Sequence, residues 1–337
     1  MENQIQHNIS LKPYNSFGID VRAKTFIKIS GVNECEHILE AKGEDTLVLG
    51  GGSNILFTKN YDGLIIKNEI SGIEKIEEDE GCIYIKAGAG VVWHQFVLYC
   101  IKNNYAGVEN LALIPGCVGA SPIQNIGAYG AEIRQVVHTV ETFHKCDKAK
   151  VNFSNKDCAF GYRDSIFKNK YKNQLLITSV TFRLFKKPVF NISYGAIEKE
   201  LANMGVQDLN ITAIAHAVIN IRSSKLPDPA QIGNAGSFFK NPEIEIEEFN
   251  TLKNNFPEIV GFALPGNKTK LAAGWLIEQC GWKGFRRADA GCHKNQALVL
   301  VNYGTAKGEE ILQLSNEIIA SVQQKFGVIL EREVNII

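Results

Sequence analysis

The segment that decides the fold is Ile114-Pro-Gly-Cys-Val-Gly-Ala-Ser-Pro-Ile-Gln-Asn-Ile-Gly-Ala-Tyr-Gly130. From Pro115 to Gly130 it contains two prolines, four glycines and few charged residues. Proline fixes φ and glycine permits φ values that are closed to other residues, so the composition predicts a rigid, irregular backbone surface. Long loops of this kind inside a compact domain are usually functional, and this one would present N–H donors to a phosphate or a cofactor ring. A purely structural Ω-loop is the alternative.

A second glycine-rich segment, Gly50-Gly-Gly-Ser-Asn54, follows the compact apolar strand predicted over Thr46–Leu49. Glycines at this place let backbone N–H groups approach an anion such as a pyrophosphate closely, and the Ser and Asn side chains add hydrogen bonds. A plain tight turn is equally consistent with these residues. The segment is neither G-x-G-x-x-G nor a P-loop, so neither a Rossmann nor a Walker site follows from it.

The residues around these two segments predict a strand-rich first half with a few helices. The expected strands are Ile55–Phe57, Gly63–Lys67, Cys82–Lys86, Val136–Phe143 and Leu175–Leu184. The expected helices are Val32–Lys42 and Val91–Asn104, the second with Val92, Phe96, Val97 and Cys100 on one side.

After Lys186-Lys-Pro188 the pattern becomes more helical, which places a domain boundary near residue 187. The expected helices of this second half are Ala196–Met204, Ile211–Ser223, Thr269–Cys280 and Ala306–Phe326, and the expected strands are Gln296–Val301 and Val328–Ile337. The last helix has an apolar stripe at helical spacing and ends before Gly327.

Three side chains outside the glycine-rich segments are candidates for chemistry. Arg163 lies in the expected turn Gly161–Ser165 and suits bidentate recognition of a carboxylate, although a solvated surface pair with Asp164 is the alternative. Ser237 lies between a glycine and two aromatic residues, where a proton-donating hydroxyl or a capping serine would fit. Glu333, among apolar residues of the expected last strand, is either a carboxyl with a raised pKa or an exposed edge charge.

The composition limits the classes of function. Lys and Arg total 36 and Asp and Glu total 36, so no basic excess indicates a nucleic-acid or membrane-surface partner. The eight cysteines form no C-x-x-C pair and no Cys/His cluster with metal-ligand spacing, so we expect no metal site and a reducing compartment. With no apolar leader and no run of 18 apolar residues, the sequence predicts a cytoplasmic protein without a membrane segment, and we expect a monomer.

The order of the motifs closely resembles the UDP-N-acetylenolpyruvoylglucosamine reductase (MurB) family over nearly the whole chain. The blocks that carry the resemblance, besides the two glycine-rich segments, are Asn15–Asp20, Gly107–Leu111, Phe160–Phe167, Lys225–Pro229, Gly233–Pro242, Lys270–Ile277 and Leu330–Val334. Two residues near the chain end depart from the family pattern, because Arg332 stands where relatives often have proline and Asn335 where arginine is common.

The resemblance implies an α+β protein with two domains. Residues 1–187 would form an FAD-binding domain of the PCMH or vanillyl-alcohol-oxidase type, with lobes of about 1–68 and 69–187. Residues 188–337 would form a C-terminal α+β substrate domain whose last strand returns toward the flavin.

The resemblance also implies the ligands. FAD would be bound non-covalently, because the first glycine loop carries no histidine for a covalent link. The implied cofactor-binding residues are Gly50, Gly52, Ser53, Asn54, Ile114, Pro115, Gly116, Gly119, Ser121 and Gly127. The implied substrate-binding residues are Tyr194, of the family's loop-bearing subtype, and Lys225, Asn241 and Gln296.

The implied reaction passes a hydride from NADPH through FAD to the enolpyruvyl group of UDP-N-acetylglucosamine enolpyruvate, for peptidoglycan synthesis. Arg163 and a protonated Glu333 would stabilise the charge on the substrate carboxylate, and Ser237 would protonate the α-carbon. The alternatives are a flavin oxidase of the same fold acting on another substrate, and a catalytically silent UDP-sugar or flavin-binding protein.

Overall fold

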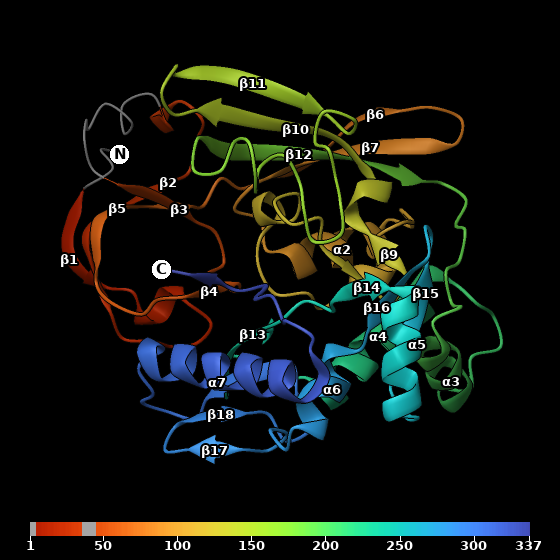
Figure 1. Cartoon of the computed structure of the whole chain (residues 1–337). Coiled ribbons are helices and arrows are strands. Elements are labelled where there is room, and N and C mark those ends of the chain that lie inside the picture. Colours follow the sequence, from red (N-terminus) through yellow and green to blue (C-terminus); the bar gives the residue numbers. More distant parts are fainter. Residues whose placement is uncertain (1–4, 36–44) are drawn as a thin grey trace. The chain divides into compact units, whose positions relative to one another are not determined.

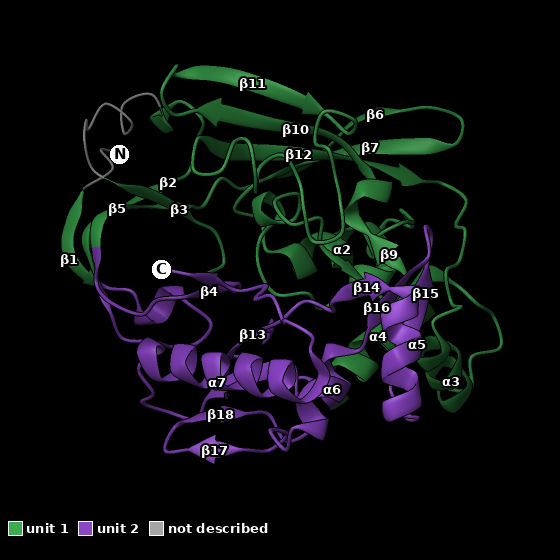
Figure 2. Ribbon diagram, viewed as in Figure 1, with its two compact units in different colours: residues 1–9, 23–52, 62–224 green, residues 10–22, 53–61, 225–337 purple. Residues whose placement is uncertain are grey.

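The computed structural model describes residues 5–35 and 45–337, which form two compact units. Figure 1 shows their elements, and Figure 2 distinguishes the units by colour. Of the described residues, unit 1 comprises 5–9, 23–35, 45–52 and 62–224, and unit 2 comprises 10–22, 53–61 and 225–337. The helix expected over Val32–Lys42 extends into residues 36–44, which lie outside the described residues.

The first sheet of unit 1 has four strands in the order β1-β2-β5-β3. Its strands are β1 (Gln6–Ser10), β2 (Arg22–Ile29), β5 (Tyr61–Asn68) and β3 (Thr46–Leu49). β3 begins and ends as the sequence predicts and pairs with β5 in parallel, with Leu49 level with Lys67. The glycine-rich segment therefore starts where β3 ends, at the edge of this sheet.

The second sheet of unit 1 has five antiparallel strands in the order β11-β10-β12-β7-β6, seen at the top of Figure 1. Its strands are β11 (Ala149–Ser154), β10 (Val137–His144), β12 (Leu175–Phe185), β7 (Cys82–Gly88) and β6 (Ile73–Glu78). Eight of the eleven residues of β12 are buried, which explains its nearly continuous apolar sequence.

Three helices belong to the core of this second sheet: α2 (Trp93–Lys102), α3 (Gly195–Asn203) and α4 (Ile211–Lys225). α2 buries Trp93 and Phe96 in this core. The Trp93 ring lies 5.5 Å from the Phe96 ring and 5.9 Å from the Phe182 ring. Val92, expected on the apolar face of this helix, precedes it and is 45% exposed.

The division between the units falls after Ser224, not near residue 187. α3 and α4 stay with unit 1 because they bury Ile197, Leu201 and Ile214 in the same core cluster as Phe182 of β12. The change of composition after residue 187 marks the end of the five-stranded sheet. It does not mark the end of the core that packs against this sheet.

Unit 2 contains a four-stranded antiparallel sheet and a three-stranded one. The first is ordered β13 (Gly233–Ser237), β19 (Val299–Asn302), β18 (Ala290–Cys292) and β17 (Arg286–Arg287). The second is ordered β14 (Glu243–Glu245), β16 (Lys268–Leu271) and β15 (Gly261–Leu264). β19 begins three residues later than the strand expected from Gln296.

The helices of unit 2 are α5 (Ile246–Asn255), α6 (Ala273–Gln279) and α7 (Gly308–Phe326). The helix expected over Thr269–Cys280 is wrong in its first turn, because Lys268–Leu271 pairs as β16 with β14 and β15. α7 buries the predicted stripe of Ile311, Leu314, Ile318, Val322 and Phe326, and it ends at Gly327 with φ 73°.

Two segments from the N-terminal part of the chain belong to unit 2. Phe17 accepts a hydrogen bond from the Asn302 amide through its carbonyl oxygen (2.9 Å), and its ring lies 6.2 Å from that of Phe238. β4 (Ile55–Leu56) pairs in parallel with β20 (Asn335–Ile336). These contacts explain why a simple division of the sequence into two halves does not describe the units.

The long strand expected over Val328–Ile337 is wrong. Within it the structure has β20 and an isolated antiparallel bridge between Arg332 and Phe239. Glu333 therefore lies in an irregular segment between the bridge and β20, so the strand alternation argued for Glu331 and Glu333 does not apply.

Disulfides, metal-binding clusters and membrane-length helices can also be sought in the structure. All eight cysteines lie within the described residues, and none of them forms a disulfide. In the described ranges we find no group of three or more His, Cys, Asp or Glu side chains placed to hold a metal ion. In the same ranges no helix combines the length and the apolar character that crossing a bilayer requires.

Candidate active site

The two glycine-rich segments meet, backbone against backbone, in unit 1. A Cβ on Gly51 would lie 2.8 Å from the Gly116 Cα, and one on Gly50 would lie 3.8 Å from the Cys117 Cβ. A side chain at residue 51 would have to displace backbone, so the glycine is required by this close approach. The structure thus brings Gly50, Gly52, Pro115 and Gly116 of the predicted cofactor site into one place.

This meeting point offers backbone donors. In the part of the chain that the structure describes, the N–H groups of Gly51, Gly52, Gly116 and Cys117 donate no hydrogen bond. Gly52 has φ 61°, in the left-handed region that forms half of an anion-binding backbone nest. Backbone N–H groups normally find a partner, so these donors fit the diphosphate of a dinucleotide such as FAD.

Three other predicted cofactor residues of this loop have different roles in the fold. A Cβ on Gly119 would lie 2.5 Å from that of Ala89, so this glycine permits close packing. The Ser121 side chain is buried, and its hydroxyl donates to the Val118 carbonyl at 2.7 Å. Ile114 is half-buried and packs against the core cluster of unit 1.

Arg163 is held against the hairpin of β8 (Gly127–Ala128) and β9 (Ala131–Glu132). Its Nη2 donates to the Gly127 carbonyl at 2.8 Å, and a Cβ on Gly127 would lie 3.2 Å from its Nη1. Arg163 itself has φ 53°, in the turn closed by the bridge between Gly161 and Asp164. The predicted arginine-bearing turn is confirmed, and strained backbone of this kind is concentrated at functional sites.

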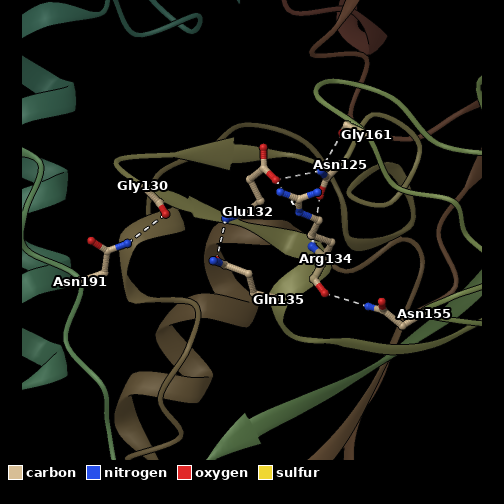
Figure 3. A network of polar contacts seen from close by, with 8 residues as sticks. All are labelled: Asn125, Gly130, Glu132, Arg134, Gln135, Asn155, Gly161 and Asn191. Atoms are coloured by element: carbon tan, nitrogen blue, oxygen red, sulfur yellow. Dashed lines mark hydrogen bonds and ion pairs between the residues drawn. The ribbon is translucent and has the colours of Figure 1, made fainter. Parts of the chain in front are cut away.

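A polar network fixes the position of this hairpin, as Figure 3 shows. The Asn125 amide donates to Glu132 Oε2 (3.2 Å) and to the Gly161 carbonyl (2.8 Å), joining the hairpin to the Arg163 turn. Arg134 forms an ion pair with Glu132 at 2.7 Å. The Asn191 amide donates to the Gly130 carbonyl at 2.9 Å, which attaches the segment before α3 to the hairpin tip.

Two residues beside the hairpin, Tyr129 and Arg222, were not predicted from the sequence. Tyr129 has φ 49°, and its ring lies edge-on to that of Tyr194 at 5.4 Å. Arg222 of α4 donates from Nε to the Leu113 carbonyl at 3.2 Å and hydrogen-bonds to Tyr129. Burial raises the pKa of the Tyr129 hydroxyl, and Arg222 opposes this effect. An arginine four residues after the buried Val218, and so on the same side of α4, is the signal that could have identified it.

In unit 2 the chain end runs antiparallel to the residues after β13. The Lys240 N–H donates to the Glu331 carbonyl (2.9 Å), and the Glu333 N–H donates to the Phe238 carbonyl (2.8 Å). Phe238 and Phe239 are buried, whereas Ser237 at the end of β13 is exposed. Ser237 and Glu333 therefore lie on adjacent backbone segments, with the Glu333 N–H bonded to the carbonyl of the residue after Ser237.

The segment around Glu333 is held by three side chains. The Asn54 amide donates to the Glu333 carbonyl at 3.2 Å, and the Asn335 amide donates to the Asn54 carbonyl at 3.0 Å. Arg332 donates from Nε to Ser315 Oγ at 2.9 Å and also bonds to Asn316, both on α7. The two residues that depart from the family pattern thus fix the chain end on α7 and on Asn54.

The remaining predicted substrate residues fall into two places. Asn241 Oδ1 accepts the Ala273 N–H at 3.0 Å, and Gln296 Oε1 would lie 3.2 Å from a Cβ on Gly274. Asn241 and Gln296 therefore meet at the start of α6. Lys225 is exposed as the last residue of α4, and Tyr194 is 51% exposed at the start of α3.

Two family models match the chain. A model described as the C-terminal domain of UDP-N-acetylenolpyruvoylglucosamine reductase matches residues 228–337, and one described as an FAD binding domain matches residues 28–146. A reductase of the same name from Flavobacterium johnsoniae is 48% identical to this chain, over 99% of this chain and 100% of the relative.

The chain belongs to the UDP-N-acetylenolpyruvoylglucosamine reductase family.

A second member of this reductase family, from Amoebophilus asiaticus, is 49% identical over 99% of both chains. The crystal structure of the reductase from Thermus caldophilus covers 99% of both chains with a TM-score of 0.68 at 24% identity, so it shares the fold. The expected α+β class, with an FAD-binding fold followed by a C-terminal α+β domain, is confirmed.

Proposed function

We propose that this protein reduces the enolpyruvyl group of UDP-N-acetylglucosamine enolpyruvate with NADPH, using non-covalently bound FAD, to give UDP-N-acetylmuramate for peptidoglycan synthesis. The observation that carries the proposal is the 48% identity to a curated reductase over the length of both chains. The FAD binding domain match over residues 28–146 supports the flavin. We further propose that the protein acts in the cytoplasm as a monomer.

FAD, held by the residues described below, would supply the two-electron chemistry that links NADPH to the substrate double bond. The backbone donors of Gly51, Gly52 and Gly116 would hold its diphosphate, with Ser53 and Asn54 continuing the same segment. Gly127 would leave room for a close approach to the Arg163 guanidinium. The cofactor roles of Ile114, Gly119 and Ser121 would be to shape the loop, because the Ile114 and Ser121 side chains and the absence of a side chain at Gly119 serve its packing.

Three side chains would act on the reacting atoms. The Arg163 guanidinium would stabilise negative charge on the substrate carboxylate, in the orientation set by its bond to Gly127. The Ser237 hydroxyl would give a proton to the α-carbon, and the Glu333 carboxyl would stabilise the charge that precedes this transfer. The hydrogen bond from Glu333 to Phe238 supports the joint action of these two residues.

The UDP-sugar would be held by Tyr194, Lys225, Asn241 and Gln296, with the lysine supplying charge for the diphosphate. The exposed Tyr194 ring supports a mobile aromatic contact of the loop-bearing subtype. We assign FAD binding chiefly to unit 1 and the substrate contacts of Asn241 and Gln296 to unit 2.

An anaerobic spectroscopic experiment tests the reaction. Purified protein should be yellow, should bleach on addition of NADPH, and should recover its colour on addition of UDP-N-acetylglucosamine enolpyruvate. Protein without flavin absorbance even after incubation with FAD would contradict the flavin assignment. Recolouring by O₂ but not by the enolpyruvate would identify an oxidase of the same fold instead.

A further inference from the structure

Lys67 contacts the backbone of the glycine-rich segment Gly50–Asn54, which follows β3. Lys67 is level with Leu49 in the parallel pair of β3 and β5, so its side chain reaches the first residue after β3. The Lys67 ammonium is half-buried and donates to the Gly50 carbonyl oxygen at 2.8 Å. Lysine side chains are mostly exposed, so a half-buried lysine that bonds to a backbone carbonyl calls for an explanation.

Among the described residues, no acid neutralises this ammonium. Over the described residues Lys67 forms no ion pair, and the nearby acid Glu69 is paired with Lys28 at 3.1 Å. The thiol of Cys117 is buried, and burial raises its pKa against the opposing effect of Lys67, so it stays uncharged. The positive charge of Lys67 is therefore available to an anion near the glycine-rich segment.

The hydrogen bond to Gly50 also orients the next N–H group. The described chain contains no cis peptide bond, and in a planar trans peptide the C=O and the following N–H point in opposite directions. Because Lys67 holds the Gly50 oxygen on its own side, the Gly51 N–H must point away from Lys67. Gly51 is exposed, and its N–H donates to no other described residue.

We propose that Lys67 is a positioning residue for the FAD diphosphate, which holds the Gly50 carbonyl and so aims the Gly51 N–H at a phosphate oxygen. This inference rests on the proposed use of FAD. Lys67 would act through the peptide that it fixes and through its uncompensated charge, without touching the reacting atoms.

The test is a titration of flavin-free full-length protein with FAD, followed by flavin fluorescence. Lys67→Met keeps most of the apolar stem and should weaken FAD binding roughly 10- to 100-fold, since it removes a hydrogen bond from a charged group. Lys67→Arg keeps a charged donor and should bind within about threefold of the unsubstituted protein. Lys24→Met, which removes an exposed lysine from β2 of the same sheet, is the control for charge.

A second measurement separates positioning from a merely structural role. In unsubstituted protein labelled with ¹⁵N-glycine, saturation with FAD should shift the Gly51 amide signal strongly, and this part of the test needs no variant. In Lys67→Met the same shift should be smaller. An unshifted Gly51 signal, or a Lys67→Met affinity within about threefold of normal, would overturn the role of Lys67. If the unsubstituted protein binds no FAD at all, the proposed function itself fails.

Discussion

Ser237 occupies a position in which its hydroxyl is accessible while its neighbours are fixed. The following residues, Phe238 and Phe239, are buried, and Phe238 is bonded through its carbonyl to the Glu333 N–H. A small residue on a fixed backbone can present a proton at a defined point, which is what a general acid requires.

The Ser237→Ala variant should lose the second half of the reaction and keep the first. Bleaching by NADPH needs no proton from Ser237, whereas turnover with the enolpyruvate should fall about 10²–10⁴-fold, the usual contribution of a general acid. Stopped-flow absorbance measures both half-reactions separately. Ser71→Ala, at an exposed serine of unit 1, is the matched control. Turnover of Ser237→Ala within about tenfold of normal would refute the role of this serine.

Glu109 is a carboxyl whose titration should affect stability. It is 4% exposed, and its Oε2 accepts the Gly107 N–H at 2.6 Å. Burial raises the pKa of Glu109, against the opposing effect of that hydrogen bond. The folded protein therefore keeps this proton to higher pH than the unfolded chain does.

Because the folded state binds this proton more tightly than the unfolded chain does, protonated Glu109 contributes its full stabilisation below the pKa of an ordinary glutamate. This stabilisation should be lost as pH rises through the raised pKa of the folded state. Glu109→Gln removes this dependence. Its free energy of unfolding relative to the unsubstituted protein should therefore increase with pH, as measured by urea unfolding between about pH 5 and 8. Glu80→Gln, at an exposed residue of unit 1, controls for the lost charge. Parallel pH profiles for Glu109→Gln and the unsubstituted protein would show that Glu109 is not the group responsible.

At the scale of elements, α7 is fixed by a close approach at its first residue. A Cβ on Gly308 would lie 1.8 Å from the Phe57 carbonyl oxygen, so the helix begins against the backbone of the 53–61 segment. The contact joins the longest helix of unit 2 to a segment that is distant in sequence. The apolar stripe of α7 was predictable from the sequence, whereas the contact of its first residue with Phe57 was not.

Gly308→Ala should destabilise the protein by about 1–3 kcal/mol or more, because backbone must move to admit the methyl group. Gly195→Ala is a matched control, since Gly195 also begins a helix and a Cβ there would meet no atom within 4 Å. The control should be neutral or stabilising by about 0.4–1 kcal/mol. Urea unfolding compares the two variants, and equal effects would mean that the contact with Phe57 is not limiting.

At the scale of the whole molecule, unit 2 is assembled from three separate segments. The sheet of unit 2 is bonded through Asn302 to the Phe17 carbonyl, and β20 has β4 as its partner. The five-stranded sheet of unit 1 with α2, α3 and α4 is instead built from residues 73–225 alone. The two parts should therefore differ in their ability to fold in isolation.

A fragment of residues 225–337 should not unfold cooperatively, because it lacks the segments 10–22 and 53–61 that complete its core. A fragment of residues 69–224 should give a cooperative transition, since its core cluster lies within it. Circular dichroism during urea unfolding measures both. A cooperative transition in the 225–337 fragment would show that the two N-terminal segments are dispensable.

The sequence by itself determined the local elements that have strong periodicity and the order of the motifs. β3 and the apolar stripe of α7 were predictable because hydrophobic spacing and flanking glycines are local properties of the chain. The arginine-bearing turn at Arg163 was predictable for the same reason.

Only the tertiary structure decided which distant segments belong together. The length of the last strand was overestimated. Only short parts of the chain end pair with neighbouring backbone, at Phe239 and at β4. Packing between residues far apart in sequence decided three other features. These are the boundary at Ser224, the position of Arg222 beside Tyr129, and the contact of Lys67 with the Gly50 carbonyl. Such contacts are set by shape and burial across the whole unit, which no local pattern of residues encodes.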